Sequence, residues 1–374
     1  MFTITTTTAV FARQLATVAR IVPSRTNDPI LTNVLCRADR SPFPQVTLIG
    51  FDLELGIETR FEAGVSAAGT TTLPARLLAD ILTQLPNEPL TIEVSDTHGI
   101  DIRCPSGHYQ LQGASAEEFP SLPRIDSTPL VLPLPVLQSG FGLTVFSAST
   151  EKTKQILNSV CLRGLPDGLE FVAIDGHRLA YRYIELQTPV TDITLVLPRR
   201  SVRELQKLLV KQNADSVRLL FDEKHMSFQF PKQILTTRLL SGRYPEYPRL
   251  LPQSFKITVE ADRRTLCSAL ERIAVIASQK HHICKFELSS SGALTLSVNA
   301  LDKGQARQTV FVDYAGPEFT IAFNCKYVLE GLKTFDSRKV VLNFNGPDNP
   351  AVFSPSGDEL HHRYLVMSVS LRNA

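Results

Sequence analysis

Three segments of the chain share one pattern of apolar and polar positions. They begin at Leu73, Leu197 and Phe323, with starts 124 and 126 residues apart. After each start, apolar residues recur at intervals of three and four, which is typical of a helix that buries one face. These apolar residues are Leu78, Ile81, Leu82 and Leu85; Val202, Leu205, Leu208 and Leu209; and Val328, Leu329, Leu332 and Phe335. The sequence therefore predicts three amphipathic helices in equivalent places.

The segments around these helices repeat as well. Each third of the chain opens with a strand-like run and a further helical pattern, and three strand-like runs follow the helix described above. The predicted opening strands cover residues 2–6, 130–134 and 255–259; the later ones cover 90–94, 217–221 and 340–344, then 100–103, 226–230 and 351–353, then 109–112, 235–240 and 363–367. The helical pattern after residue 134 is the weakest, because Gly140 and Gly142 disfavour a helix.

This repetition predicts an α+β protein of three similar domains, each with two helices packed on antiparallel sheets. We expect the domains at residues 1–125, 126–252 and 253–374, with proline-rich linkers at 117–123 and 244–252. Three similar domains in a row, each with its own core, indicate an arc or a ring closed by oligomerisation.

Composition and charge narrow the class of protein. A hydrophobic content of 43% with 20% charged residues is typical of a globular protein with an ample core. No apolar run reaches the roughly 18 residues that span a bilayer, and no signal peptide is visible, so we expect a cytoplasmic protein. The six cysteines form no Cys-x-x-Cys pair and are expected to be free thiols. We expect no metal and no cofactor.

The net charge of +2 is unevenly distributed, at −4, +4 and +2 for the three expected domains. This is not the global excess of a protein that binds nucleic acid tightly through charge. One local feature stands out: Arg199, Arg203, Lys207 and Lys211 recur every four residues, opposite the apolar face of the predicted helix. Such a stripe suits weak contact with phosphates, and an ordinary solvated helix face would show the same pattern.

Six short motifs, taken together and in this order along the chain, resemble the bacterial sliding clamp family, the beta subunit of DNA polymerase III. They are residues 73–76 (Leu-Pro-Ala-Arg), 174–180 (Ile-Asp-Gly-His-Arg-Leu-Ala), 197–200 (Leu-Pro-Arg-Arg), 242–247 (Gly-Arg-Tyr-Pro-Glu-Tyr), 323–327 (Phe-Asn-Cys-Lys-Tyr) and 364–367 (Tyr-Leu-Val-Met). The resemblance covers the whole chain. It implies a head-to-tail homodimeric ring of six domains that encircles duplex DNA without sequence preference, with helices lining the hole. It also implies a non-enzymatic processivity factor whose partners are the DNA polymerase III catalytic subunit, the clamp loader and other replication and repair proteins that carry a short clamp-binding motif.

The resemblance also implies two sets of site residues. The DNA-facing set is Arg13, Arg20, Arg25, Arg76, Arg199, Arg203, Lys207, Lys211, Arg263 and Lys326. A hydrophobic peptide pocket between the second and third domains would be lined by Leu157, Gly176, His177, Arg178, Leu179, Pro245, Leu250, Leu365 and Met367. An apolar hollow with a methionine that can repack suits a short hydrophobic motif shared by several partners. For each apolar member taken singly, plain core packing is the alternative.

The dimer interface departs from the family pattern. Well-known members pair a basic strand with an acidic segment, whereas the counterparts here, residues 103–111 and 300–309, contain one acidic residue, Asp302. We therefore expect apolar contacts, of Tyr109 and Leu111 against Val275 and Ile276, together with strand pairing across the edge.

Parts of the sequence also suggest three other classes of protein. His177 beside Asp175 could suggest acid–base catalysis, but no nucleophile elbow, phosphate-binding glycine loop or Rossmann fingerprint accompanies them. The runs at residues 281–284 and 361–362 contain metal-ligand types, but adjacent histidines in a strand point to opposite faces. A sequence-specific DNA reader would need a recognition helix and a stronger basic bias.

Overall fold

The computed structural model describes the chain except for residues 152, 192, 278–281, 301–303 and 371–374. The chain divides into two compact units. Unit 1 comprises residues 1–134 and 211–239, and unit 2 comprises residues 135–210 and 240–374. A segment of the middle third of the sequence thus belongs to the same unit as the first third.

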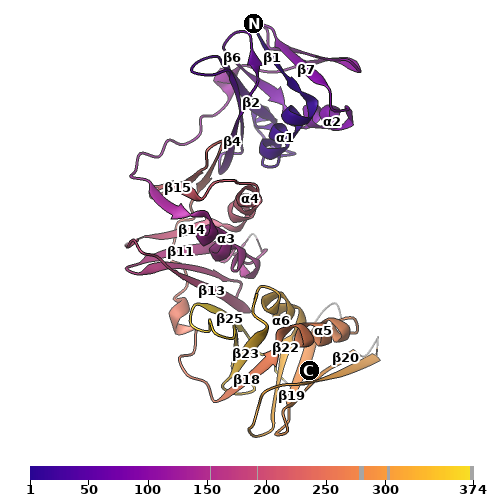
Figure 1. Cartoon of the computed structure of the whole chain (residues 1–374), viewed down its shortest axis with the longest axis vertical. Coiled ribbons are helices and arrows are strands. Elements are labelled where there is room, and N and C mark those ends of the chain that lie inside the picture. The colour runs from indigo at the N-terminus through magenta and orange to yellow at the C-terminus, as the bar shows by residue number, and fades with distance from the viewer. Residues whose placement is uncertain (152, 192, 278–281, 301–303, 371–374) are drawn as a thin grey trace. The chain divides into compact units, whose positions relative to one another are not determined.

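The same order of elements occurs three times: a strand, a helix, four strands, a helix and three strands, with one short extra strand in the first copy (Figure 1). The first copy contains β1 (Phe2–Thr7), α1 (Thr8–Ala19), β2 (Asn33–Asp39), β3 (Gln45–Phe51), β4 (Leu55–Glu62), β5 (Gly64–Val65), β6 (Gly69–Pro74), α2 (Ala75–Gln84), β7 (Pro89–Val94), β8 (Gly99–Cys104) and β9 (Gly107–Gln112). The second contains β10 (Leu130–Pro133), α3 (Leu134–Gly142), β11 (Ser159–Leu165), β12 (Gly168–Ile174), β13 (Arg178–Glu185), β14 (Thr194–Pro198), α4 (Arg199–Leu209), β15 (Ser216–Phe221), β16 (His225–Gln229) and β17 (Gln233–Arg238). The third contains β18 (Ile257–Asp262), α5 (Arg263–Ala274), β19 (Ile283–Leu288), β20 (Ala293–Ala300), β21 (Gly304–Phe311), β22 (Phe319–Asn324), α6 (Cys325–Leu332), β23 (Lys339–Phe344), β24 (Ala351–Pro355) and β25 (His362–Val366). The predicted threefold repetition of an α+β unit is confirmed.

Several predicted elements differ from the observed ones by a few residues at their ends. The third opening strand begins at Ile257, two residues later than expected. Helix α4 ends at Leu209, because the Val210 N–H closes its last turn on the Gln206 carbonyl at 3.2 Å. The predicted stripe of four cations therefore has three members on the helix, and Lys211 lies beyond its end.

Strand pairing in unit 1 joins two copies of the repeat. One sheet runs β10-β15-β16-β17-β4-β3-β2-β6, and the last strand of the second copy, β17, pairs antiparallel with the fourth strand of the first, β4. The other sheet runs β5-β1-β7-β8-β9 and ends at β9. Thus β9, the last strand of the first copy, is a free sheet edge among the described residues.

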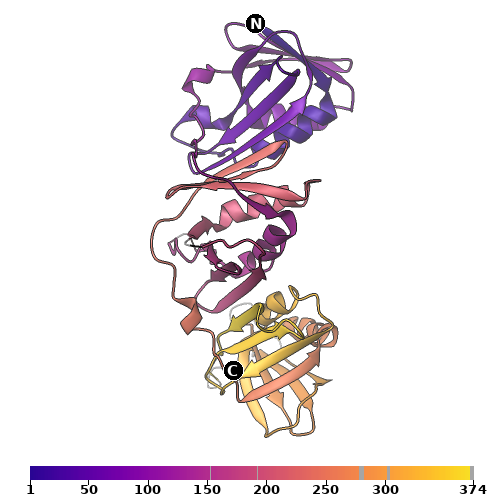
Figure 2. The same ribbon diagram turned by 60° about the vertical axis from the view of Figure 1, so that its left-hand side comes forward.

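Unit 2 repeats this arrangement. Its larger sheet runs β14-β11-β12-β13-β25-β24-β23-β18, and here the last strand of the third copy, β25, pairs antiparallel with the fourth strand of the second, β13. In this join Tyr364 lies opposite Ala180. The smaller sheet runs β21-β20-β19-β22 and ends at β21, the fourth strand of the third copy. Like β9, β21 is therefore a terminal strand whose outer side pairs with no other strand in the described part of the chain. Figure 2 shows the third copy in orange to yellow.

Helices α1 and α2 pack together in unit 1, and α5 and α6 pack together in unit 2. Polar side chains start several of them: Thr7 accepts a hydrogen bond from the Val10 N–H, and Asp262 accepts one from the Thr265 N–H. Pro74 and Pro198 stand at the corresponding places before α2 and α4, where a fixed φ favours entry into a helix. These residues mark where each of the four helices begins.

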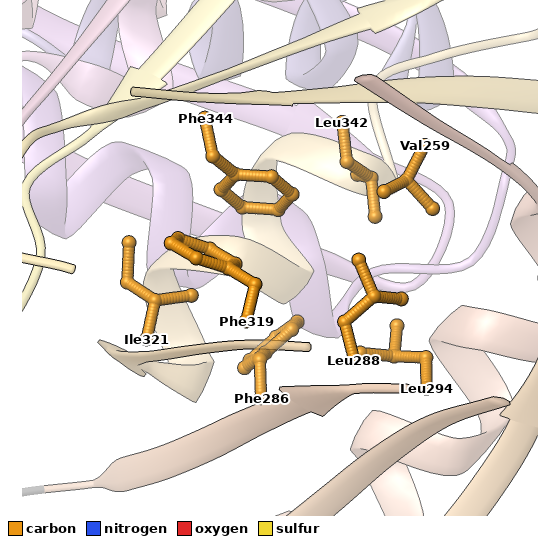
Figure 3. Close-up of a pocket in the computed structure, with 8 residues that line it drawn as sticks. All are labelled: Val259, Phe286, Leu288, Leu294, Phe319, Ile321, Leu342 and Phe344. Carbon is orange, nitrogen blue, oxygen red and sulfur yellow. The ribbon is translucent and has the colours of Figure 1, made fainter. Parts of the chain in front are cut away.

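The core of the third copy lies between two sheets. Figure 3 shows side chains from β18 and β23 pointing toward side chains from β19, β20 and β22. They are Val259, Phe286, Leu288, Leu294, Phe319, Ile321, Leu342 and Phe344. The space left between them is about 10 Å³ and entirely apolar, so it offers no polar partner to a water molecule. This gap is a packing defect of a dry core.

Candidate functional site

A polar hollow of about 420 Å³ in unit 2 brings together residues that lie far apart in the sequence. We call it the α4–α6 hollow, because the first turns of these two helices form its sides. It is lined by Phe146, Ala148, Ser149, Thr150, Glu151, Asp175, His177, Arg178, Arg199, Arg203, Lys326, Tyr327 and Glu330. Three of the sequence-predicted DNA-facing residues and two of the predicted pocket residues thus share one depression.

Three of the four Arg and Lys side chains that line the hollow come from α4 and α6. Arg199 and Arg203 lie one turn apart on α4, and Lys326 follows Asn324, whose Oδ1 accepts hydrogen bonds from the N–H groups of Lys326 and Tyr327. Burial lowers the pKa of Arg199, and repulsion by Arg203 and Arg178 adds to the effect. Within the described residues, the buried Nε of Arg199 has no hydrogen-bond partner. An anion in the hollow would relieve this repulsion.

The floor of the hollow is built around one buried arginine. Arg178 donates from Nε to Asp175 Oδ2 at 2.9 Å, from Nη1 to Glu330 and from Nη2 to the Phe146 carbonyl at 3.1 Å. Its guanidinium also lies 4.4 Å from the ring centre of Tyr327. Asp175 in turn accepts from the His177 and Arg178 N–H groups, which closes the turn between β12 and β13. Arg178 therefore ties this turn to α6.

An apolar cluster lies on the opposite face of the same sheet. Leu179 and Leu365 are opposite each other on β13 and β25, and both pack with Leu157, Tyr244 and Leu251. Successive side chains of a strand point to opposite faces, so Leu179 joins this cluster while the neighbouring Arg178 points toward the hollow. The structure brings Leu157, Leu179 and Leu365 together and places the Arg178 side chain away from them.

The remaining predicted pocket residues lie near the surface. Leu250 is 48% exposed and Met367 is 42% exposed, both high for large apolar side chains. The Met367 N–H donates to the His177 carbonyl at 2.8 Å. The His177 ring stacks on the Tyr327 ring, with 6.1 Å between the ring centroids. Gly176 has φ +96, a conformation that favours glycine.

A neighbouring groove contains residues that the sequence analysis did not single out. Pro245 lies there beside Tyr247, whose hydroxyl donates to the buried carboxylate of Glu170. Tyr181 also donates to Glu170, at 2.9 Å, and Arg163 lies 3.8 Å from it. Burial raises the pKa of Tyr181 and Tyr247, and the Glu170 charge raises it further. No sequence signal pointed to Glu170, because nothing in its local pattern differs from a solvated strand residue.

The other predicted DNA-facing residues are distributed over both units. Arg13 and Arg76 are exposed on α1 and α2, Arg25 is exposed in a loop, and Arg20 is half-buried at the end of α1. In unit 2, Lys207 pairs with Glu204 at 2.7 Å, and Arg263 donates from Nε to the Ser337 carbonyl at 2.8 Å.

The predicted interface residues lie at the two free edges or beside them. Tyr109 and Leu111 belong to β9 and share a face with the buried residues Ile102 and Ile100 of β8. Val275, the residue directly after α5, is 76% exposed, and Ile276 is partly buried. Asp302, the acidic residue noted in the sequence, lies outside the described residues.

The structure bears on the metal and membrane alternatives only where it describes the chain. In that part, no group of three or more His, Cys, Asp and Glu side chains is placed to hold a metal ion. His361 is exposed and His362 buried, as expected for neighbours on opposite faces, and His281 lies outside the described residues. Among the described helices, none has the length and apolar character needed to cross a membrane.

Comparison with known proteins gives matches over nearly the whole chain. Three family models match in order: the N-terminal domain of the DNA polymerase III beta subunit at residues 1–123, the central domain at 132–246 and the C-terminal domain at 248–370. The beta sliding clamp of Synechococcus elongatus is 41% identical over 96% of this chain and 96% of its own length, and that of Synechocystis is 38% identical over 96% and 97%. The crystal structure of the Pseudomonas aeruginosa sliding clamp bound to griselimycin superposes with a TM-score of 0.92 at 27% identity and covers 99% of this chain and 100% of that one.

Proposed function

Since the chain belongs to the DNA polymerase III beta subunit family, the beta sliding clamps, we propose that two copies close into a ring around duplex DNA. The chain is a replication clamp and not an enzyme: it tethers the replicative polymerase to DNA and so confers processivity. We place it in the cytoplasm, and its partners are the polymerase, the clamp loader and proteins with a short clamp-binding motif. We assign its three domains to residues 1–125, 126–252 and 253–374.

The proposal of a ring rests on β9 and β21, whose outer sides pair with no strand among the described residues. Inside the chain, the last strand of one copy of the repeat pairs twice with the fourth strand of the copy before it, as β17 with β4 and as β25 with β13. The same rule leaves β9 and β21 without partners among the described residues. A second chain supplies both missing partners at once, because its β21 can pair with β9 and its β9 with β21. Two heterologous joins of this kind close a ring of two chains.

The in-chain joins also predict the register of the join between chains. Tyr109 occupies the place in β9 that Tyr364 occupies in β25, since each lies opposite a buried residue of the preceding strand. Ala306 occupies the place of Ala180, and both pack on the core of the third copy. Because Tyr364 lies opposite Ala180, we expect Tyr109 of one chain opposite Ala306 of the other.

This interface can be tested with a pair of matched variants. Val275→Asp is expected to raise the dimer dissociation constant about a hundredfold, because each of the two joins loses the burial of one valine, roughly 1.5 kcal/mol each. Sedimentation equilibrium measures the constant. Val210→Asp is the control, since Val210 also directly follows a helix and is 82% exposed. Equal constants for the two variants would contradict an interface at Val275.

We propose that the cations of the helices face the DNA. Arg199, Arg203 and Lys326 are held at helix starts, and a phosphate would supply the partner that the buried Arg199 Nε lacks within the described residues. The remaining members are Arg13, Arg20, Arg25, Arg76, Lys207, Lys211 and Arg263. Few and partly neutralised cations suit a protein that slides, because enclosure rather than charge would retain it.

We propose that partners dock on the apolar cluster of Leu157, Leu179 and Leu365, with the exposed Leu250 and Met367 at its rim. Gly176, His177 and Pro245 would complete the rim, and Arg178 would act by holding the turn in place. Leu179 and Leu365 are buried, so the exposed apolar contacts would come from Leu250 and Met367, and a methionine side chain can repack around different short hydrophobic motifs. Griselimycin, which is bound to the Pseudomonas aeruginosa clamp, is a suitable probe.

Truncation after Val366 is expected to weaken griselimycin binding at least tenfold, because it removes the exposed Met367 side chain and the hydrogen bond from its N–H to the His177 carbonyl. Isothermal titration calorimetry measures the affinity. The single variant Met367→Ala separates the side chain from the rest of the tail. If the truncated chain bound griselimycin as tightly as the full chain, the rim assignment would be wrong, while an unchanged dimer mass would show that the chain is still folded.

A further inference from the structure

One carboxylate interrupts the apolar sheet face on which the cluster of Leu157, Leu179 and Leu365 lies. Glu170 alternates on β12 with Val172 and Ile174, so its side chain points to the same face as theirs, and Ile174 lies directly opposite Leu179. The Glu170 side chain is nonetheless buried, at 9% exposed. A buried charge costs free energy unless other groups pair with it. The groups that pair with Glu170 therefore show which segment it holds in place.

Two hydroxyl groups and one cation pair with this carboxylate. Tyr247 donates to Oε2, Tyr181 donates to Oε1 at 2.9 Å, and Arg163 Nη1 lies 3.8 Å from Oε2. Tyr181 and Arg163 belong to β13 and β11, the strands on either side of β12, whereas Tyr247 belongs to the linker 244–252. Of these three contacts, the one with Tyr247 thus ties the linker to the sheet. Tyr247 is 4% exposed, so water competes little for this hydrogen bond.

Tyr247 connects the carboxylate to the rim of the proposed docking surface. It begins a single turn of 3-10 helix, Tyr247–Arg249, and its carbonyl accepts a hydrogen bond from the Leu250 N–H at 3.0 Å. The exposed Leu250 is therefore bonded to the residue that Glu170 holds. The ion pair of Arg249 with Glu246, at 2.9 Å, holds the linker only weakly, because the Arg249 side chain is 83% exposed.

Stability alone does not require a charge at position 170. An apolar side chain of similar size often stabilises a protein as well as a paired buried charge does. A hydrogen bond differs from an apolar contact in that it fixes a distance and a direction. A rim that is already held in its binding position loses less conformational freedom when a partner docks, and this raises affinity.

We propose that Glu170 is a positioning residue for partner docking, which holds Tyr247 and, through Tyr247, keeps Leu250 at the rim of the apolar cluster. This inference rests on the docking surface proposed above for short hydrophobic motifs. It adds the residue that fixes the linker side of that surface.

Tyr247→Phe and Tyr181→Phe form a matched pair of variants. Each removes one hydroxyl group from the same carboxylate and keeps the contact between the two rings, whose centroids lie 6.3 Å apart. Tyr247→Phe is expected to raise the dissociation constant of griselimycin about fivefold, because Leu250 then occupies its binding position for a smaller share of the time. Tyr181→Phe is expected to leave the constant within about twofold of the unmodified chain. Isothermal titration calorimetry measures both constants.

A merely structural role for Glu170 predicts equal effects of the two variants, so equal dissociation constants would overturn the positioning role. The double variant Glu170→Ala/Tyr247→Phe gives a second test. It is expected to bind no more than about twofold more weakly than Glu170→Ala, because both changes remove the same hydrogen bond. Single effects that multiplied in the double variant would also overturn the proposal.

Leu250→Ala distinguishes this inference from the docking proposal on which it rests. If Leu250→Ala bound griselimycin as tightly as the unmodified chain, the rim assignment itself would be wrong, and the positioning role would fall with it. If Leu250→Ala weakened binding while Tyr247→Phe did not, the docking surface would stand and the role of Glu170 alone would be refuted.

Discussion

Chains loaded onto a nicked circular plasmid by a clamp loader are expected to stay with the plasmid through gel filtration at high salt, and to leave it when a restriction enzyme cuts the circle. The expected change is from nearly complete retention to nearly complete loss. A closed ring can leave a circle only by opening, whereas it slides off a linear end. Salt weakens phosphate contacts steeply but does not open a topological link.

The double variant Arg199→Ala/Arg203→Ala distinguishes retention on DNA by enclosure from retention by charge. It removes two cations of the α4–α6 hollow without touching either free edge. Its binding to short linear duplexes is expected to weaken, with a shallower salt dependence, while its retention on closed circles persists. If the unmodified chain stayed on linear and circular DNA alike, contact rather than enclosure would explain retention, and the ring would not be the basis of function.

Arg178→Ala is expected to destabilise unit 2 by about 3–5 kcal/mol, because it leaves the Asp175 and Glu330 carboxylates without their buried partner. It also removes the contact between the guanidinium and the Tyr327 ring. A loss of this size lowers the melting temperature by roughly 10 °C in a domain of this size. Differential scanning calorimetry would record the shift.

Arg203→Ala provides the matched comparison, since Arg203 lines the same hollow but is exposed. Arg203→Ala is expected to change the free energy of unfolding by no more than about 0.5 kcal/mol. The melting temperature of Arg178→Lys should lie closer to that of Arg178→Ala than to that of the unmodified chain. An ammonium group lacks the planar set of donors with which the guanidinium reaches three acceptors. Equal melting temperatures for Arg178→Ala and Arg203→Ala would show that the arginine does not hold the turn.

The helices were predictable because their signal is local. Apolar residues every three or four positions identify α2, α4 and α6 within a short window, and the repetition of the pattern identifies three copies. The turn at Asp175 and Gly176 was also visible, since the side-chain and backbone requirements of a tight turn are met by neighbouring residues.

What the sequence could not predict depends on contacts between distant segments. Nothing near Arg178 shows that its guanidinium will meet Glu330, 152 residues later. Whether Arg178 or Leu179 faces the apolar cluster depends on which distant segments cover each face of β13. The segment with Tyr244 and Leu251 packs on the side of Leu179, and Glu330 lies on the side of Arg178. The pairing of β17 with β4 has the same origin, because register across a join of two repeats has no local signal.

That join between β17 and β4 has a consequence for dissecting the molecule. A fragment that stopped at residue 125 would contain β4 but not β17, and would expose the N–H and C=O groups with which residues 55–59 of β4 pair with β17. Open edges of this kind pair readily with other chains and lead to aggregation. The smallest piece that keeps its hydrogen bonds satisfied is therefore discontinuous in sequence, and it requires the segment 211–239 as well as the first third of the chain.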